Sequence, residues 1–213
     1  FQVVRNTSNR GALQNIRDGL AALGVVTNPE AVCFALDGDD WLSRSDAFAI
    51  VERAYASGDV WLTNGSFVEH PSGRRSWWVG PFPPVVVLRN MFRDYPWQAT
   101  HLRTFKAHLW NRLTDADLVE PETGEAWRVT WDLAMMFPML EYAGARHVFT
   151  PDVLYVYNRG TGLNDDVLRK DAQLAADRRI RAMPRRTLVP YTRSPPTHAW
   201  SSWMRWASAL VPP

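Results

Sequence analysis

The sequence predicts an α/β fold, because segments with the pattern of strands alternate with segments with the pattern of helices. An apolar run at 31–36 has the length and composition of a buried strand, and it ends in a cluster of carboxylates. Apolar residues recur at helical spacing on both sides of this run, and a β-rich run follows at 153–157. The 213 residues are enough for one domain with one core.

The first half of the chain is expected to alternate regularly between strands and helices. Leu13, Ile16 and Leu20 fall on one face of a helix, and Asn28-Pro29 ends it. The expected elements are a strand at 3–4, a helix at 11–23, the strand at 31–36, a helix capped by Ser45 or Asp46, a strand at 60–63, and a turn at Asn64 and Gly65.

The second half begins with a long segment, 70–98, that is rich in Pro, Gly, Arg and Trp. Long irregular segments in compact domains are usually functional, so it is interpreted as a flap or an acceptor-side loop. The elements expected after it are a helix at 101–113, a helix at 132–143 with a kink at Pro138, a strand at 153–157 and a charged helix at 165–183.

A change of composition at Pro184 divides the chain into a domain, 1–183, and a Pro/Trp-rich linker with a short tail helix, 184–213. Trp200, Trp203 and Leu210 fall on one face of that helix. Such a face suits peripheral contact with a membrane surface, and it equally suits packing on the domain.

Composition excludes several classes of protein. Hydrophobic residues make up 46% and charged residues 22%, as in globular proteins, and the net charge of +2 gives no broad surface for nucleic acid. No run approaches the 18 apolar residues of a membrane span, and no secretory signal is visible, so a cytoplasmic location is expected. The single cysteine, Cys33, is interpreted as a buried, inert thiol.

Three carboxylates, Asp37, Asp39 and Asp40, directly follow the apolar run. Each opposes the ionisation of its neighbours. A divalent cation removes this conflict because Mg²⁺ and Mn²⁺ prefer oxygen ligands, and Gly38 lets a ligand approach closely. Ligands of open α/β sheets bind at the carboxyl ends of strands, so the turn predicts a metal-bound anionic substrate. The alternative is an acidic turn that caps the next helix.

Five blocks in the chain together resemble one family, the family 2-type nucleotide-sugar glycosyltransferases with the GT-A fold. The acidic turn resembles their D-x-D motif, and the other blocks resemble R-N…G-A-L-x-N, S-H-L-R-T-F, D-L-A-x-M-F-P-M-L-E-x-A-G, and L-Y-V-Y-N with N-D. They are Arg5-Asn6 with Gly11-Ala12-Leu13-Gln14-Asn15, Leu36-Asp37-Gly38-Asp39-Asp40, Thr100-His101-Leu102-Arg103-Thr104-Phe105, Asp132 to Gly144, and Leu154-Tyr155-Val156-Tyr157-Asn158 with Asn164-Asp165.

The resemblance implies a mixed central sheet flanked by helices. Family members begin with further strands that carry part of the nucleoside pocket, and this chain begins at what resembles the third strand. We therefore expect it to be amino-terminally truncated. The resemblance also implies a metal-dependent, inverting hexosyltransferase, which uses Mn²⁺ or Mg²⁺ to move a hexose or deoxyhexose from an NDP-sugar, foremost a UDP-sugar, to a glycan or glycoconjugate.

The resemblance also implies roles for individual residues. Asp39 and Asp40 would bind the metal, and Asp132 would take the proton of the acceptor hydroxyl. Asp132 could instead only stabilise the amino terminus of its helix. The residues implied in donor binding are Arg5, Asn6, Gly11, Ala12, Asp37, Gly38, His101, Arg103, Asn158 and Asn164.

Some residues keep two interpretations. Glu141 is a weaker catalytic candidate or the structural partner of an arginine. Trp41, Trp97 and Trp131 could stack on sugar rings or belong to the core. The main alternative for the whole chain is a non-catalytic module that binds sugar nucleotides or another protein. An EF-hand is excluded, because Leu42 and Phe48 occupy the positions of its Gly and Glu, and the downstream blocks do not fit a polymerase palm.

Overall fold

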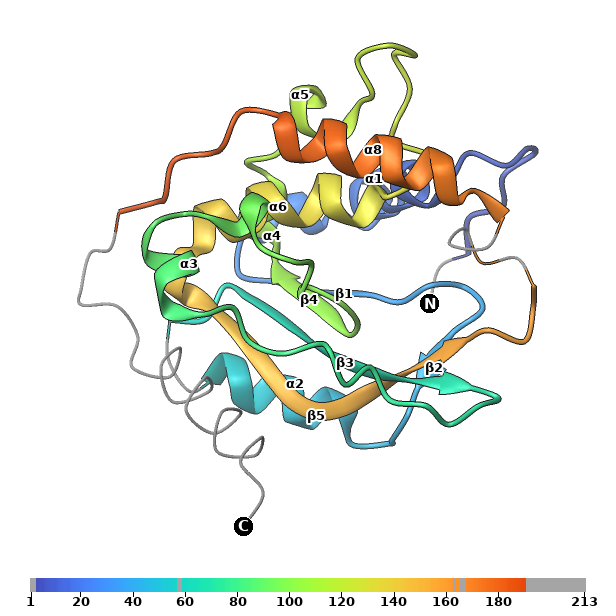
Figure 1. The fold of residues 1–213 in the computed structure, drawn as a ribbon, viewed down its shortest axis with the longest axis vertical. Helices are drawn as coiled ribbons and strands as arrows, with labels where there is room; N and C mark the ends of the chain where they lie inside the picture. The colour runs from blue at the N-terminus through green and yellow to red at the C-terminus, as the bar shows by residue number, and fades with distance from the viewer. Residues whose placement is uncertain (1–2, 57–58, 163, 165–167, 191–213) are drawn as a thin grey trace.

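The computed structural model describes residues 3–56, 59–162, 164 and 168–190. It has the predicted α/β class, with helices on both faces of one five-stranded mixed sheet (Figure 1). In the sheet, β3 and β5 are parallel and the other neighbours are antiparallel. The strands, in the order β1-β4-β3-β5-β2 across the sheet, are β1 Val32–Ala35, β4 Arg103–Lys106, β3 Leu62–His70, β5 His147–Asn158 and β2 Trp41–Leu42.

The described helices form two unequal groups. Those that pack with α6 lie on one face of the sheet, and α2 covers the other face (Figure 1). The α-helices are α1 Ala12–Ala22, α2 Ala47–Ala56, α3 Pro84–Leu88, α4 Ala107–Trp110, α5 Asp115–Leu118, α6 Trp131–Ala143 and α8 Lys170–Ala182. The 3₁₀-helices are η1 Val25–Thr27, η2 Phe92–Asp94 and η3 Gly144–Arg146.

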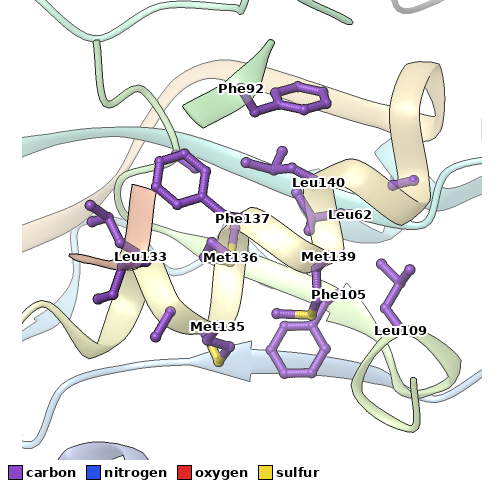
Figure 2. Packing of buried hydrophobic residues seen from close by; sticks show 14 of the residues in the cluster. Leu62, Phe92, Phe105, Leu109, Leu133, Met135, Met136, Phe137, Met139 and Leu140 are labelled. Carbon is purple, nitrogen blue, oxygen red and sulfur yellow. The ribbon is translucent and has the colours of Figure 1, made fainter. Parts of the chain in front are cut away.

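Helix α6 is the centre of the larger core. Ten of its 13 residues are buried, and nine of these ten are apolar, so the helix is covered by neighbours on most of its surface. Figure 2 shows Met136, Phe137 and Leu140 of this helix packed beside Leu62 of β3 and Phe92 of η2. The predicted helix at 132–143 is therefore confirmed, and it continues through Pro138.

The smaller core lies on the other face of the sheet. Ala47, Ile50 and Val51 of α2 pack on Phe67 and Tyr155. The predictions of helices at 11–23 and after Asp46 and of a strand at 31–36 are confirmed within one to three residues. Burial raises the pKa of the half-buried Cys33 thiol to about 11, in agreement with an inert thiol.

The prediction of one helix at 101–113 is wrong. Arg103–Lys106 form β4, which pairs with β1 and β3, and only Ala107–Trp110 form a helix, α4. The apolar spacing resembled that of a helix, but pairing with two neighbouring strands satisfies the backbone of β4 and overrides this local pattern.

The predicted turn at Asn64 and Gly65 is also wrong, because both residues lie inside β3. A Cβ on Gly65 would lie 3.3 Å from the carbonyl oxygens of His101 and Thr150. Glycine at this position therefore permits the close approach of two neighbouring chain segments. Asn64 is buried and donates to the Gln98 carbonyl over 2.7 Å.

Several other expectations differ in extent. Residues 3–4 form no strand, and the side chains of Val3 and Val4 are exposed. Strand β5 begins six residues before the expected 153–157, and the two-residue strand β2 was not predicted. Within 70–98, Phe82, Val86 and Phe92 belong to the core, so this part is not a free flap.

The last described residues, 184–190, pack on the rest of the domain. Arg146 donates to the carbonyls of Val189 and Pro190 over 3.0 Å, and Arg186 pairs with Asp117 at 2.6 Å. The predicted tail helix lies outside the described residues, as does Asp165.

Candidate active site

A pocket of about 340 Å³ lies where the acidic turn after β1 meets the amino terminus of α6. Pairing of Ala35 with Arg103 aligns β1 with β4 and brings the turn beside His101. Residues predicted from widely separated segments therefore meet here. The pocket is lined by Ala12, Asp37, Gly38, Asp39, His101, Arg103, Thr130, Trp131, Asp132, Tyr157, Asn164 and Gln173.

Asp40 fixes the acidic turn to β5. Its two carboxylate oxygens accept hydrogen bonds from the Tyr155 hydroxyl at 2.6 Å and from the Asn158 backbone N–H at 2.7 Å. The Tyr155 hydroxyl in turn accepts the Asp37 N–H at 3.1 Å, and the Asn158 amide donates to the Asp39 carbonyl at 3.1 Å. Asp40 and Asn158 hold the turn without lining the pocket, whereas Asp37 and Asp39 line it.

Asp37 is the most perturbed carboxyl of the turn. Its carboxylate accepts no hydrogen bond from the part of the chain that the structure describes. Burial raises the pKa of Asp37 to about 6; nearby Arg103 lowers it, and the charges of Asp40, Asp132 and Asp39 raise it. A carboxyl in this situation is stabilised in its ionised form by a bound cation.

Ligand atoms of Asp37, Asp40 and His101 all lie within 4.8 Å of one another, which is close enough for a shared cation. The His101 Nδ1 atom, however, lies 3.3 Å from Nη1 of Arg103. Arginine only donates, so Nδ1 accepts and Nε2 of the neutral ring carries the proton. Burial holds the pKa of His101 well below its usual value, and the ring stacks on Tyr155. A cation here would therefore be held by carboxylates, with His101 as a hydrogen-bond donor.

Arg103 holds Asp132 in place. Its guanidinium donates to Asp132 Oδ2 at 2.7 Å and to the Ala99 carbonyl at 3.0 Å, and it lies 5.7 Å from the Trp131 ring centroid. The Arg103 side chain is 3% exposed and that of Asp132 is 20% exposed. Arg103 is thus bound to protein atoms, and Asp132 retains access to the pocket from the first turn of α6.

Other predicted donor residues lie beside the pocket. Ala12 lines both it and a neighbouring pocket of about 330 Å³ that Gly11 also lines. A Cβ on Gly11, where φ is +81°, would lie 3.4 Å from Cδ of Arg128, so a protein side chain makes the close approach there. Asn6 donates to Asn15 at 2.7 Å, and Arg5 is exposed outside these pockets.

Tyr155, Tyr157 and Gln173 had no individual role in the sequence-based prediction of the site. Tyr155 and Tyr157 lie two residues apart on β5 and so share one face, which is a pattern that could have indicated them. Tyr157 accepts from the Asn164 amide at 3.1 Å. Gln173 of α8 reaches the pocket from a charged helix, and no local pattern distinguishes it.

Glu141 lies in the core and not at the pocket. It is fully buried, and it accepts hydrogen bonds from Arg93 Nη2 at 3.1 Å and from the Arg186 backbone N–H at 2.7 Å. The structural interpretation of this residue is therefore the correct one.

Glu141→Gln is expected to lower the free energy of unfolding by about 3–5 kcal/mol, because it leaves the charge of buried Arg93 uncompensated. Glu122→Gln, which removes an exposed pair with Arg179, should leave the free energy of unfolding almost unchanged. Urea denaturation of both variants measures the difference; equal losses would contradict this role of Glu141.

The pocket carries negative charge. Among the described residues that line it, Asp37, Asp39 and Asp132 accompany one cation, Arg103, which leaves two negative charges when all four are ionised. This excess matches the charge of one divalent cation, and oxygen-only ligands suit Mg²⁺ or Mn²⁺.

Affinity for Mn²⁺ is expected to depend on pH, because the ion must displace the proton of Asp37. The affinity should rise up to tenfold per pH unit below about 6 and level off above it. The contribution of Asp37 to the stability of the metal-free protein should fall as pH rises from 3.8 through about 6, because folding disfavours ionised Asp37; the difference in stability between the wild type and Asp37→Asn isolates it. Titration calorimetry checks the first effect; an unchanged pH profile in Asp37→Asn would contradict the assignment.

Comparison with models of known protein families gives no match, and comparison with curated proteins gives none. No helix among the described residues is long and apolar enough to cross a membrane.

Proposed function

We propose that this protein is a metal-dependent, inverting glycosyltransferase of GT-A architecture that moves a hexose or deoxyhexose from an NDP-sugar, foremost a UDP-sugar, to a glycan or glycoconjugate. The observation that carries the proposal is the shared pocket of Asp37, Asp39 and Asp132. These residues would supply an acidic turn for the metal and a carboxylate that is accessible from the same pocket. A cytoplasmic location and a membrane-contacting tail remain predictions from the sequence.

Each group has a defined task in the proposed reaction. Asp39 and Asp40, with Asp37 beside Asp40 in the same turn, would hold Mn²⁺ or Mg²⁺, which when bound neutralises the charge of the diphosphate leaving group. The acceptor oxygen attacks the anomeric carbon, the bond from that carbon to the phosphate oxygen breaks, and NDP leaves. Asp132 accepts the proton of the attacking hydroxyl. Arg103 orients Asp132 through the 2.7 Å ion pair.

A second candidate function is the binding of a sugar nucleotide without turnover. One observation favours it: the Arg103 guanidinium donates to Oδ2 of Asp132 at 2.7 Å, so this carboxylate oxygen is already engaged by a protein donor. Both functions use the same pocket and the same metal.

Release of NDP and free sugar separates the two functions. The protein would be incubated with UDP-, GDP- and dTDP-sugars and Mn²⁺, and the products followed by chromatography. NDP release that EDTA abolishes supports the enzyme. Metal-dependent binding without NDP release, alone or with added glycoside acceptors, supports the binding module.

A further inference from the structure

A second groove, of about 280 Å³, adjoins the acidic pocket. Thr130, Asp132 and Gln173 line both of them. Asp132 thus lies in the wall between the two spaces, where one carboxylate is accessible from both sides. A base that takes a proton from one substrate while a second substrate reacts has to lie at such a boundary.

The lining of this groove combines apolar and polar side chains. Trp97, Leu133 and Leu174 supply an apolar surface, with Trp97 half-buried against Phe137 at a centroid distance of 5.2 Å. Gln173, from α8, adds an amide at the edge. Sugar rings need this combination, because they present an apolar C–H face and a rim of hydroxyl groups.

The charged residues of the groove neutralise each other. Arg181 Nε donates to Asp177 at 2.6 Å, and its Nη1 donates to the carbonyls of Arg93 and Tyr95. Among the described residues, the Gln173 side-chain amide has no hydrogen-bond partner, so it can both donate to and accept from a ligand. Asp132 in turn pairs with Arg103 at 2.7 Å, so the described lining leaves no uncompensated cation to attract an anionic ligand.

The position of the groove beside Asp132 and its mixed apolar and polar lining point to an acceptor subsite. We propose that this groove binds a neutral sugar, with its C–H face on Trp97 and Leu174 and a hydroxyl directed at Asp132. The inference rests on the proposed glycosyl transfer and adds the class of acceptor. In the reaction the sugar hydroxyl gives its proton to Asp132 and its oxygen to the new glycosidic bond, while NDP leaves into the acidic pocket.

The test uses p-nitrophenyl β-glucoside, β-galactoside and α-rhamnoside as neutral probes and p-nitrophenyl β-glucuronide as the anionic one. Binding is measured by saturation-transfer NMR without donor, and transfer by chromatography with donor and Mn²⁺. Leu174→Ser and Gln173→Ala change the groove. Leu88→Ser is the matched control, because Leu88 is also an exposed leucine and lines none of the pockets described here.

We expect a neutral glycoside to bind, and both groove variants to raise its Kd and its KM at least tenfold relative to Leu88→Ser. The donor KM should stay within twofold in Leu174→Ser, because Leu174 lines the groove and not the acidic pocket. The wild type could bind a glycoside, lose that binding in Leu174→Ser, and yet release NDP from no donor. This result would support the sugar subsite and contradict the transferase. Donor turnover with no binding of neutral glycosides, with preference for the glucuronide, or with unchanged KM in both variants would overturn the subsite.

Discussion

Asp132→Asn is expected to lower the rate of glycosyl transfer by about 10²–10⁴-fold and to leave metal-dependent donor binding intact. Asparagine has the same size and can still accept the hydrogen bond from Arg103, but it cannot take a proton from the acceptor. The change therefore removes the base, while a side chain of the same size still separates the pocket from the groove. Initial rates with saturating donor, together with donor Kd, measure the two effects separately.

Asp115→Asn is the matched control, because Asp115 is also in the first turn of a helix and its side chain is 76% exposed. It should leave transfer unchanged. If Asp132→Asn kept full turnover, Asp132 would be only a helix-terminal residue stabilised by the helix dipole.

Arg103→Gln is expected to lower the free energy of unfolding by about 3 kcal/mol and to impair transfer. The buried guanidinium contacts Asp132, His101 and the Ala99 carbonyl, and its charge also lowers the pKa of Asp37. Its loss leaves the acidic pocket without a positive charge. The pH at which Mn²⁺ affinity levels off should therefore rise.

A double-mutant cycle tests this interpretation of the Arg103 effect. The free energy of unfolding lost in the double mutant should be smaller than the sum of the losses in the two single mutants, because either change alone already breaks the ion pair. Arg128→Gln, which removes an exposed pair with Glu125, should cost about 0–1 kcal/mol. Additive effects of Arg103→Gln and Asp132→Asn would show that the 2.7 Å ion pair does not couple the two residues.

Elements with strong local patterns could be predicted from the sequence. The apolar run that forms β1 and the predominantly apolar α6 are specified by their own residues. The elements that were predicted wrongly depend on contacts with segments far away in the sequence. Arg103–Lys106 has helical spacing but lies between two strands, and Gly65 resembles a turn residue but permits close chain contact inside β3.

The same distinction applies to the candidate site. Its acidic turn is local in sequence, and the resemblance located Asp132, so these were available before the structure. The hydrogen bond from Tyr155 to Asp40 joins residues 115 positions apart, and Gln173 arrives from another helix. Arg103 was expected to bind the donor, because its sequence neighbours do not show that its guanidinium is buried against Asp132.

Thermal unfolding with UDP-, GDP- and dTDP-sugars, each in Mn²⁺ and in EDTA, tests the central claim most directly. A ligand at 100 times its Kd adds about 2.7 kcal/mol to folding stability, which is a readily measured shift. We predict a shift with one nucleotide sugar that requires Mn²⁺, is lost in Asp39→Ala and persists in Asp132→Asn. Cooperative unfolding with no shift from any of these donors would contradict a metal-dependent nucleotide-sugar site in this protein.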